Sequence, residues 1–466
     1  MAMVPALIST RGEAAKAEFG DVLLAGPAPD GGLYLPERWP QVSPEQIAGF
    51  KSRSYAAVAL EILSLFAADT FAPDEFAADV ASAYAGFSDA RIAPLVEIGS
   101  GLFLLELFHG PTLAFKDIAM QVLGRLFARA LAKRGGRATV VVATSGDTGA
   151  AAIAALGGLA GIELFVLHPK ERVSEVQRRQ MTTSPHANVH NIALEGTFDD
   201  AQAIVKELFA DTNFAHAVNM TAVNSINFAR IAAQCVYYFT ATAQLGRPAT
   251  FVVPTGNFGD VFAGEAAARM GLAIEKLVIA TNENDIVARA LNEGVYALGR
   301  VHPSLSPAMD IQVASNFERA LFEASDRDAA WVRKAMAAFA RDKALAIPAS
   351  VLAKLRSRYA AAHCDDRQTL ETIRKLHAET GRLIDPHTAV ALHAAYGTHR
   401  EPNIPVVVLS TAHPAKFPDA VREATGVVPA LPPRLAGLYD GTERYTVLGN
   451  DRALVRAHIE AKLAGQ

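Results

Sequence analysis

Apolar and polar positions follow two different patterns along this chain. Over residues 44–85, Phe and Leu side chains recur at steps of three and four, which is the spacing of one helix face. The preceding segment, 26–40, is rich in Pro and Gly and predicts an ordered loop. We therefore predict a mainly helical N-terminal domain over residues 1–95, and no cluster of chemically reactive residues falls within it.

After Leu102 the pattern changes to short apolar runs that alternate with helical segments. Nearly continuous Val, Ile and Leu runs are typical of parallel strands covered on both faces. We expect such strands at residues 138–143, 162–167, 189–194, 250–253, 276–280 and 404–409. Residues 96–466 are thus predicted to form an α/β region, within which 304–396 is rich in helix formers.

Composition narrows the classes of function. The 466 residues carry a formal net charge of −4, so no basic surface for nucleic acid is expected. The uncharged run 150–162 is shorter than the roughly 20 residues that span a bilayer, and residues 1–13 lack the regions of a signal peptide. Cys235 and Cys364 are too few for a disulfide scaffold. We expect a cytoplasmic protein with no membrane or nucleic-acid partner.

Lys116 stands in the segment HGPTLAFKD, directly before a helical pattern. Burial and the positive end of a helix both lower the pKa of a lysine, which makes its amine a better nucleophile. Taken alone, a solvated lysine is the more common outcome, because most lysines are exposed. The Gly-rich loops elsewhere in the chain are what favour a chemical role.

Two such loops each follow an apolar run and open a helical pattern. In PTGNFGD, Gly256 and Gly259 allow close backbone approach, and helix N-terminal amides attract an anion. No Walker pattern is completed there, so a nucleoside triphosphate site is not expected. In TSGDTG, the hydroxyls of Thr144, Ser145 and Thr148 suit a carboxylate or phosphate, and the leading glycine of a nucleophile elbow is missing. We interpret the second loop as substrate-binding.

Two more segments carry polar side chains. STAHPAKF places Ser410 and Thr411 at the carboxyl end of a predicted strand, where open α/β sheets bind ligands. His413 in the same segment has no partner at zinc spacing, so no metal is predicted. VNSINFAR supplies a polar cluster and Arg230, which could clamp an anion or could cap a helix beside a solvated arginine.

A lysine together with a phosphate cradle is the arrangement that pyridoxal phosphate (PLP) requires. That cofactor is held by a Schiff base at one end and by its phosphate at the other. The segments STRGE (9–13), DVLLAGPAPDGGLYLPE (21–37), FHGPTLAFKD, TSGDTGAAA, VNSIN, PTGNFGD and STAHPAKF together resemble the threonine synthase family in its longer bacterial and fungal form. The resemblance runs nearly end to end. It implies a fold-type II PLP enzyme with two open parallel-sheet subdomains and an N-terminal helical domain.

The resemblance implies a set of cofactor residues. Lys116 corresponds to the Schiff-base lysine and proton shuttle, and Thr411 to the hydroxyl facing the pyridine nitrogen, with Ser410 beside it. Asp147 stands where shorter members carry Asn near the 3′-oxygen of PLP. The phosphate cradle corresponds to Gly256, Asn257, Phe258 and Gly259.

It also implies a set of substrate residues. The loop with Thr144, Ser145 and Thr148 resembles the segment that holds the substrate carboxylate and flanks the cofactor ring. The candidates for the substrate phosphate are Asn224, Ser225, Arg230 and Lys416.

The activity implied is conversion of O-phospho-L-homoserine and water to L-threonine and phosphate, by a monomer or homodimer. Four alternatives stay open at this point. The first is a related phospho-lyase that releases an α-keto acid, and the second is serine or threonine dehydration. The third is a PLP- or anion-binding protein without activity. The fourth is a dinucleotide-binding protein, which the absence of G-x-G-x-x-G after the first strand of the sheet disfavours.

Overall fold

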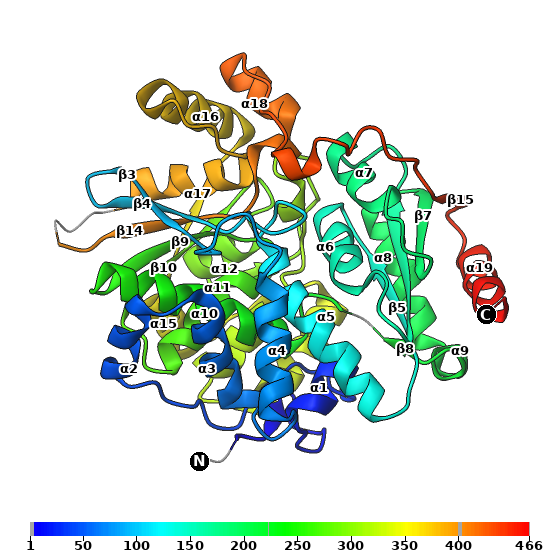
Figure 1. The fold of residues 1–466 in the computed structure, drawn as a ribbon. Helices are drawn as coiled ribbons and strands as arrows, with labels where there is room; N and C mark the ends of the chain where they lie inside the picture. Colours follow the sequence, from blue (N-terminus) through cyan, green and yellow to red (C-terminus); the bar gives the residue numbers. More distant parts are fainter. Residues whose placement is uncertain (1–3, 222, 399–402, 466) are drawn as a thin grey trace.

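The computed structural model describes residues 4–221, 223–398 and 403–465. Two sheets dominate it, and Figure 1 shows them on opposite sides of the molecule. The larger sheet has the order β13-β10-β9-β14-β4-β3 and is parallel except at β3, which is antiparallel to β4. Its strands are β3 (Leu95–Gly99), β4 (Leu102–Glu106), β9 (Ala249–Pro254), β10 (Ile274–Thr281), β13 (Tyr359–His363) and β14 (Val406–Ser410).

The smaller sheet has the order β15-β7-β6-β5-β8 and is parallel throughout its described pairs. Its strands are β5 (Ala138–Ala143), β6 (Ile162–Pro169), β7 (Val189–Glu195), β8 (Met220–Thr221) and β15 (Thr446–Gly449). Two antiparallel ribbons complete the strands, β1 (Leu7–Ser9) with β2 (Tyr34–Pro36) and β11 (Val295–Ala297) with β12 (Ala344–Ala346). The α/β fold with two mostly parallel sheets confirms the predicted fold class.

Helices pack on both faces of the two sheets. In the first half of the chain these are α1 (Phe19–Ala25), α2 (Pro44–Gly49), α3 (Tyr55–Ala67), α4 (Pro73–Tyr84), α5 (Lys116–Lys133), α6 (Asp147–Leu156), α7 (Glu175–Thr182), α8 (Phe198–Ala210), α9 (Thr212–Ala217) and α10 (Phe228–Leu245). The second half contributes α11 (Gly259–Arg269), α12 (Ile286–Glu293), α13 (Phe317–Ala324), α14 (Ala329–Asp342), α15 (Ala349–Arg358), α16 (Asp366–Thr380), α17 (Pro386–Gly397), α18 (Pro418–Thr425) and α19 (Arg452–Ala464). Short 3₁₀ turns lie at η1 (Phe50–Ser52), η2 (Pro307–Met309), η3 (Pro414–Lys416) and η4 (Pro433–Leu435). No helix in the described ranges is long and apolar enough to cross a membrane.

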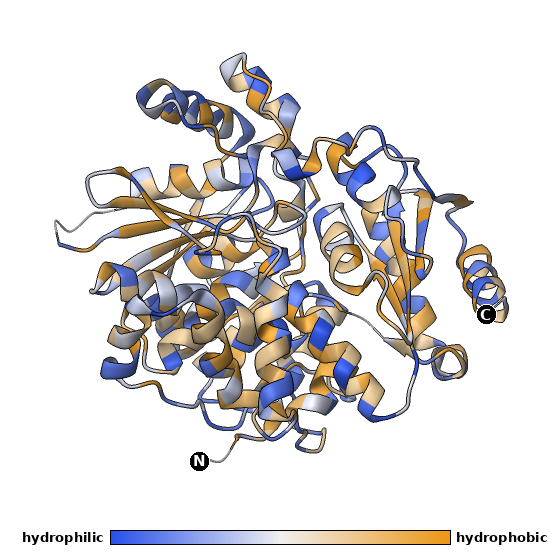
Figure 2. Cartoon of the chain, viewed as in Figure 1, coloured by the Kyte–Doolittle hydropathy of each residue, from blue (hydrophilic) through white to orange (hydrophobic). Residues whose placement is uncertain are grey.

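Successive residues of a strand in the larger sheet point alternately into the two hydrophobic layers that cover its faces. On β9, Phe251 and Val253 pack with α10 and α11, whereas Val252 packs on the opposite face with α17. Because successive strand residues point to opposite faces, a strand covered on both sides is apolar at every position. Figure 2 shows this as strands that are apolar along most of their length, while outer helices such as α16 mix apolar and polar residues.

The six predicted strands are confirmed, with bounds within two residues of those expected. The segment 304–396 is mainly helical as predicted, but it also supplies β12 and β13, and β13 forms an edge of the larger sheet. The N-terminal helices α1, α3 and α4 share one hydrophobic core with α5 and α10. The division at residue 95 therefore stays a prediction, because no separate core marks it.

Candidate active site

The carboxyl ends of strands from both sheets converge on one cavity of about 720 Å³. The loops after β5, β9 and β14 contribute to it, together with the first turns of α5 and α10. This is the edge at which open α/β sheets bind ligands. The predicted site residues that line it are Lys116, Thr144, Ser145, Thr148, Asn224, Ser225, Arg230, Gly256, Asn257, Phe258, Gly259 and Thr411. Ser410, Asp147 and Lys416 do not line the cavity and lie behind its wall.

Lys116 is the first residue of α5, as the sequence predicted, and its side chain is 12 % exposed. Its Nζ lies 3.2 Å from Oδ2 of Asp147. Burial lowers the pKa of Lys116 below its ordinary value, while the Asp147 carboxylate opposes that shift. A buried amine at the cavity wall is available for covalent attachment of a carbonyl compound.

The approach to Lys116 is fixed by close contacts. A Cβ atom at Gly110 would lie 2.3 Å from Cβ of Asp117, so only glycine fits there. Asp117 accepts hydrogen bonds from the backbone amide and hydroxyl of Thr112 at 2.8 and 2.7 Å. The amide of Phe115 donates to the carbonyl of Thr411 at 2.8 Å. Thus the segments HGPTLAFKD and STAHPAKF position each other.

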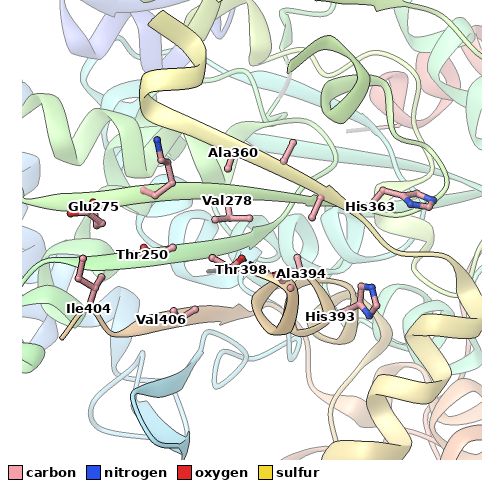
Figure 3. Close-up of a pocket in the computed structure, with 14 residues that line it drawn as sticks. Thr250, Glu275, Val278, Ala360, His363, His393, Ala394, Thr398, Ile404 and Val406 are labelled. Carbon is pink, nitrogen blue, oxygen red and sulfur yellow. Dashed lines mark hydrogen bonds between the residues drawn. The ribbon is translucent and has the colours of Figure 1, made fainter. Parts of the chain in front are cut away.

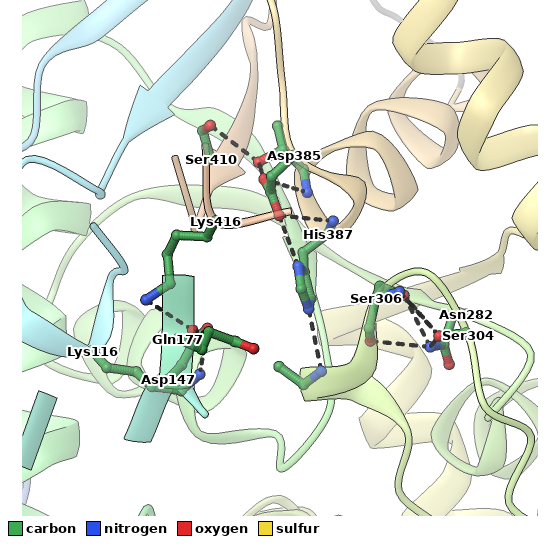
Figure 4. Close-up of polar contacts among 12 residues, drawn as sticks. Lys116, Asp147, Gln177, Asn282, Ser304, Ser306, Asp385, His387, Ser410 and Lys416 are labelled. Carbon is green, nitrogen blue, oxygen red and sulfur yellow. Dashed lines mark hydrogen bonds and ion pairs between the residues drawn. The ribbon is translucent and has the colours of Figure 1, made fainter. Parts of the chain in front are cut away.

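Asp147 is the centre of a buried charge cluster (Figure 4). Besides Lys116, it contacts Nζ of Lys416 at 3.0 Å and accepts from Gln177 at 2.9 Å. Burial alone would raise the pKa of Asp147, but the two ammonium groups and Gln177 hold it well below its usual range. Lys416 also donates to the carbonyl of Thr112 at 2.7 Å and to Gln180 at 3.0 Å. Its three donors are thereby engaged, and its predicted contact with a substrate phosphate stays a prediction.

The loop after β9 leads into α11 and presents backbone to the cavity. Phe258 adopts a left-handed conformation with φ of 64°, which turns the chain sharply into the helix. A Cβ atom at Gly256 would lie 2.8 Å from the carbonyl oxygen of Ala308, so a side chain is excluded there. Within the described ranges, the amides of residues 256–259 donate to no protein acceptor. Free amides at a helix N-terminus are suited to a phosphate.

The loop after β5 uses one of its hydroxyls internally. The hydroxyl of Thr144 accepts from the amides of Gly146 and Gly149, each at 2.9 Å, and so holds the turn together. Ser145 and Thr148 are half-buried and line the cavity, and their hydroxyls make no hydrogen bond with another described residue. These two hydroxyls remain available to a ligand, whereas Thr144 shapes the loop.

Arg230 lies in the first turn of α10 and is 3 % exposed. Its Nε and Nη1 are buried and have no hydrogen-bond partner among the residues that the structure describes. Burial lowers the pKa of Arg230 to about 10. An unpaired buried guanidinium in a cavity wall is a strong candidate for an anion site, since burying a cation without a partner is costly.

Two residues at the start of α17 were missed by the sequence reasoning. Asp385 caps the helix and lies 2.7 Å from Nδ1 of His387, and Nε2 of His387 accepts from the amide of Ala308 at 3.3 Å (Figure 4). Thr388 in turn lies 3.1 Å from the hydroxyl of Ser410. His387 lines the cavity. In the sequence, only an Asp-Pro start of a helix marked this place, and such a start is common in ordinary helices.

A buried acid in the cavity wall was also missed. Asp260 follows Gly259 at the start of α11, and the hydroxyl groups of Tyr237 and Tyr238 donate to it. Burial raises the pKa of Asp260 to about 7. Burial therefore favours the neutral acid over the carboxylate beside the cradle.

A second cavity of about 460 Å³ lies where β9, β10, β13 and β14 meet the end of α17 (Figure 3). Thr250, Val278 and Ala360 to Ala362 line it, with His363 and His393 at one end. None of the predicted site residues lines this cavity. The chemistry is therefore assigned to the larger cavity.

Family comparisons agree with this geometry. Residues 90–355 match the family described as pyridoxal-phosphate dependent enzyme, 6–84 match the threonine synthase N terminus, and 388–459 match the threonine synthase C-terminal family. Threonine synthase from Pseudomonas aeruginosa is 48 % identical over 456 residues, which is 97 % of each chain. The chain belongs to the threonine synthase family.

Solved structures of this family superpose closely. The PLP-bound threonine synthase from Brucella melitensis matches with a TM-score of 0.95 at 48 % identity, covering 98 % of this chain and 99 % of that one. The yeast threonine synthase matches with a TM-score of 0.93 at 36 % identity and 99 % coverage of both chains. The fold-type II prediction and the family prediction are both confirmed.

The residues of the cavity fit PLP. A buried amine at Lys116, four unengaged amides at residues 256–259 and a hydroxyl at Thr411 are distinct features of one cavity. They suit an aldehyde, a phosphate and a ring nitrogen, respectively. This chain is a PLP-dependent lyase of the threonine synthase family.

Proposed function

We propose that this protein converts O-phospho-L-homoserine and water to L-threonine and phosphate. The observation that carries the proposal is that the cavity has two separate places for an anion near one amine. One is the set of free amides at residues 256–259, and the other is the unpaired guanidinium of Arg230. A phosphorylated cofactor acting on a phosphorylated substrate needs two such places.

We assign the cofactor to the first place. Lys116 would hold it covalently, the amides of residues 256–259 would bind its phosphate, and Thr411 would face its ring nitrogen. Asp147 would act through Lys116 and Lys416, whose ammonium groups it contacts. Ser410 is bonded to Thr388 and would support Thr411 from behind.

We assign the substrate to the second place. Ser145 and Thr148 would bind its carboxylate, because their hydroxyls share no hydrogen bond with a described residue. Arg230 in the first turn of α10, with Asn224 and Ser225 in the loop before that helix, would bind its phosphate. A guanidinium can contact a phosphate in bidentate fashion, and a buried one gains most from doing so.

The steps of the reaction would be shared between bound PLP and the side chains of the cavity. Bound PLP supplies an electron sink that lets carbon–hydrogen bonds beside the substrate nitrogen ionise. Nζ of Lys116, once free, would accept the proton from Cα and release it before it accepts a second proton from Cβ, and its lowered pKa favours the neutral amine that this requires. The same amine would return a proton to Cγ after phosphate has left and a proton to Cα at the end of the cycle. Arg230 would stabilise the charge on the phosphate that leaves Cγ. Water would then add at Cβ.

The test is incubation of the PLP-loaded protein with O-phospho-L-homoserine, with phosphate and L-threonine both measured. Equal amounts of the two support the proposal. Phosphate with an α-keto acid and no threonine would favour the phospho-lyase, and no phosphate release would contradict the substrate assignment. The Lys116→Ala variant, assayed in parallel, controls for release that does not involve the site.

The proposal also covers the cellular location and the oligomeric state of the enzyme. We infer a cytoplasmic location, which is supported by two cysteines that are buried and unlinked. A monomer or homodimer stays a prediction, to be tested by light scattering on the purified protein.

A further inference from the structure

Asn316, the residue before α13, touches both loops that the proposed function assigns to the two phosphates. Its Nδ2 donates to the carbonyl of Ser225 at 3.2 Å and to the carbonyl of Asn257 at 3.0 Å. Its backbone amide donates to the same Asn257 carbonyl at 3.1 Å. Asn316 is fully buried and does not line the cavity. One side chain therefore connects the cradle loop with the loop that precedes Arg230.

Arg319, one turn later, completes the connection. Its Nη1 donates to Oδ1 of Asn316, and its Nη2 donates to the carbonyl of Ile226 at 2.7 Å and to that of Tyr34 at 3.0 Å. Arg319 is fully buried, and within the described part of the chain its side chain is bonded to carbonyl and amide oxygens and to no carboxylate. A planar guanidinium with fixed donors holds several carbonyls at set positions.

The N-terminal segment is attached to the same place. Glu318, between the two, accepts from the hydroxyl of Thr10 at 2.6 Å and from Arg11 at 3.0 and 2.9 Å. Thr10 and Arg11 belong to the segment STRGE, and Tyr34 belongs to the segment DVLLAGPAPDGGLYLPE (21–37). Neither segment lines the cavity. Their contacts converge on α13 instead.

We propose that Asn316 and Arg319 are positioning residues that set the distance between the cofactor-phosphate loop and the substrate-phosphate loop, with the N-terminal segment as their support. This inference rests on the proposed function, because that function gives the two loops their ligands. Neither residue touches a ligand itself. Because one side-chain amide binds both loops, a displacement of one loop displaces the other.

The coupling predicts a joint effect. Asn316→Ala removes the shared donor and leaves the Ser225 and Asn257 carbonyls to find new partners. We expect the Kd for PLP and the KM for O-phospho-L-homoserine to rise together, each by about tenfold, the size of one lost buried hydrogen bond. In the holoenzyme, amide hydrogen exchange should become faster in both 223–227 and 256–259.

A matched control separates positioning from general loss of stability. Asn191 is also buried, lies in β7 of the smaller sheet, and donates to the carbonyl of Met181 at 3.0 Å. Asn191→Ala removes a buried amide from a place that touches neither loop. It should leave the Kd for PLP and the KM unchanged, and exchange in the two loops should stay as in the parent.

Three results would overturn the inference. The first is faster exchange in only one of the two loops, the second is unchanged Kd and KM in a folded Asn316→Ala variant, and the third is an equal rise of both in Asn191→Ala. If Asn316→Ala does not fold, Asn316→Ser is read by the same measurements, with the same joint rise expected. Exchange and PLP binding need no turnover, so they test the inference even where the parent enzyme forms no threonine, which would count against the proposed function alone.

Discussion

Two buried charged groups, one in the cavity wall and one behind it, differ in how their charge is balanced. Asp147 lies between two ammonium groups, at 3.2 Å from Lys116 and 3.0 Å from Lys416. Arg230 has no carboxylate partner in the described ranges, and two of its nitrogens are buried without a hydrogen bond. Asp147 has its counter-charge within the protein alone. Arg230 has one only when an anion from outside supplies the missing charge.

This difference distinguishes a charged group that stabilises the fold from a charged group that binds a ligand. Removing one partner of a buried ion pair leaves an uncompensated charge and costs about 3–5 kcal/mol. Removing an ion that never had a partner abolishes a desolvation cost instead. Substitutions in the two places should therefore change stability in opposite directions, and the predictions for Asp147 and Arg230 use that contrast.

The largest effect is expected at Lys116, which belongs to the balanced cluster and also faces the cavity. Lys116→Ala should lower turnover by at least about 10³-fold, since it removes both the covalent anchor and the proton acceptor. The measurement is threonine formation together with the absorbance of bound PLP. Lys133→Ala, at the exposed end of the same helix, should keep parent activity. Substantial threonine formation by Lys116→Ala would remove it from the catalytic role.

Asp147→Asn should give the next largest effect, and it acts on stability. The variant leaves Lys116 and Lys416 without their shared counter-ion, so we expect a loss of about 3–5 kcal/mol in the free energy of unfolding at neutral pH. The measurement is denaturant unfolding, and Asp419→Asn, an exposed surface acid, should show almost no change.

The same variant should alter the pH dependence of stability. The folded-state pKa of Asp147 is lowered, so its contribution is present above the ordinary range of Asp and is lost as pH falls toward the lowered value. Parent stability should therefore fall below about pH 4, where an unfolded Asp begins to bind a proton. Asp147→Asn should show a shallower acid decline, and an unchanged acid limb would contradict the assignment.

Arg230→Met tests the charged group that has no counter-ion in the described protein. We expect the KM for O-phospho-L-homoserine to rise by about 100-fold, the value of a charge-assisted hydrogen bond to phosphate. The free energy of unfolding without substrate should stay equal or increase, because a buried unpaired cation has been removed. Arg422→Met on the surface should change neither quantity. A large loss of stability in Arg230→Met would show that the guanidinium serves the fold.

The smallest effect is expected at Thr411. Thr411→Val keeps the shape and removes one hydroxyl, so the Kd for PLP should rise by about five- to tenfold. The absorption spectrum of the bound cofactor should shift, since the ring contact is lost while the phosphate contacts remain. Thr425→Val, at the end of α18, is the control. An unchanged spectrum and Kd would count against the placement of Thr411.

Much of this architecture could be predicted from local patterns. The strands at β5, β6 and β9 are continuous apolar runs, and Lys116 at the start of α5 follows from the helical pattern after it. By contrast, β13 consists largely of alanine, and β15 has only four residues, of which Val447 is exposed and the others are half-buried, so neither carries an apolar signature. These strands are held by pairing with β10 and β7, which a local pattern does not contain.

The residues of the site were also predicted only in part. Glycines and hydroxyls in short loops marked the cavity, because such loops have few other uses after a buried strand. Asn316, Arg319 and His387 were missed, since each acts through a contact with a segment far away in the chain. Lys416 was recognised as important, but its partners could be identified only from the folded arrangement.

The pairing of β4 with β14 has a consequence for how the chain is made. These strands align Leu102 with Val406 in parallel, although about 300 residues separate them in sequence. During synthesis, four strands of the smaller sheet emerge between residues 138 and 221, whereas the larger sheet lacks a central strand until residue 410 is made. Long-range pairing of this kind slows folding. We therefore expect nascent chains to acquire the smaller sheet first, and to become able to retain PLP only near the end of translation.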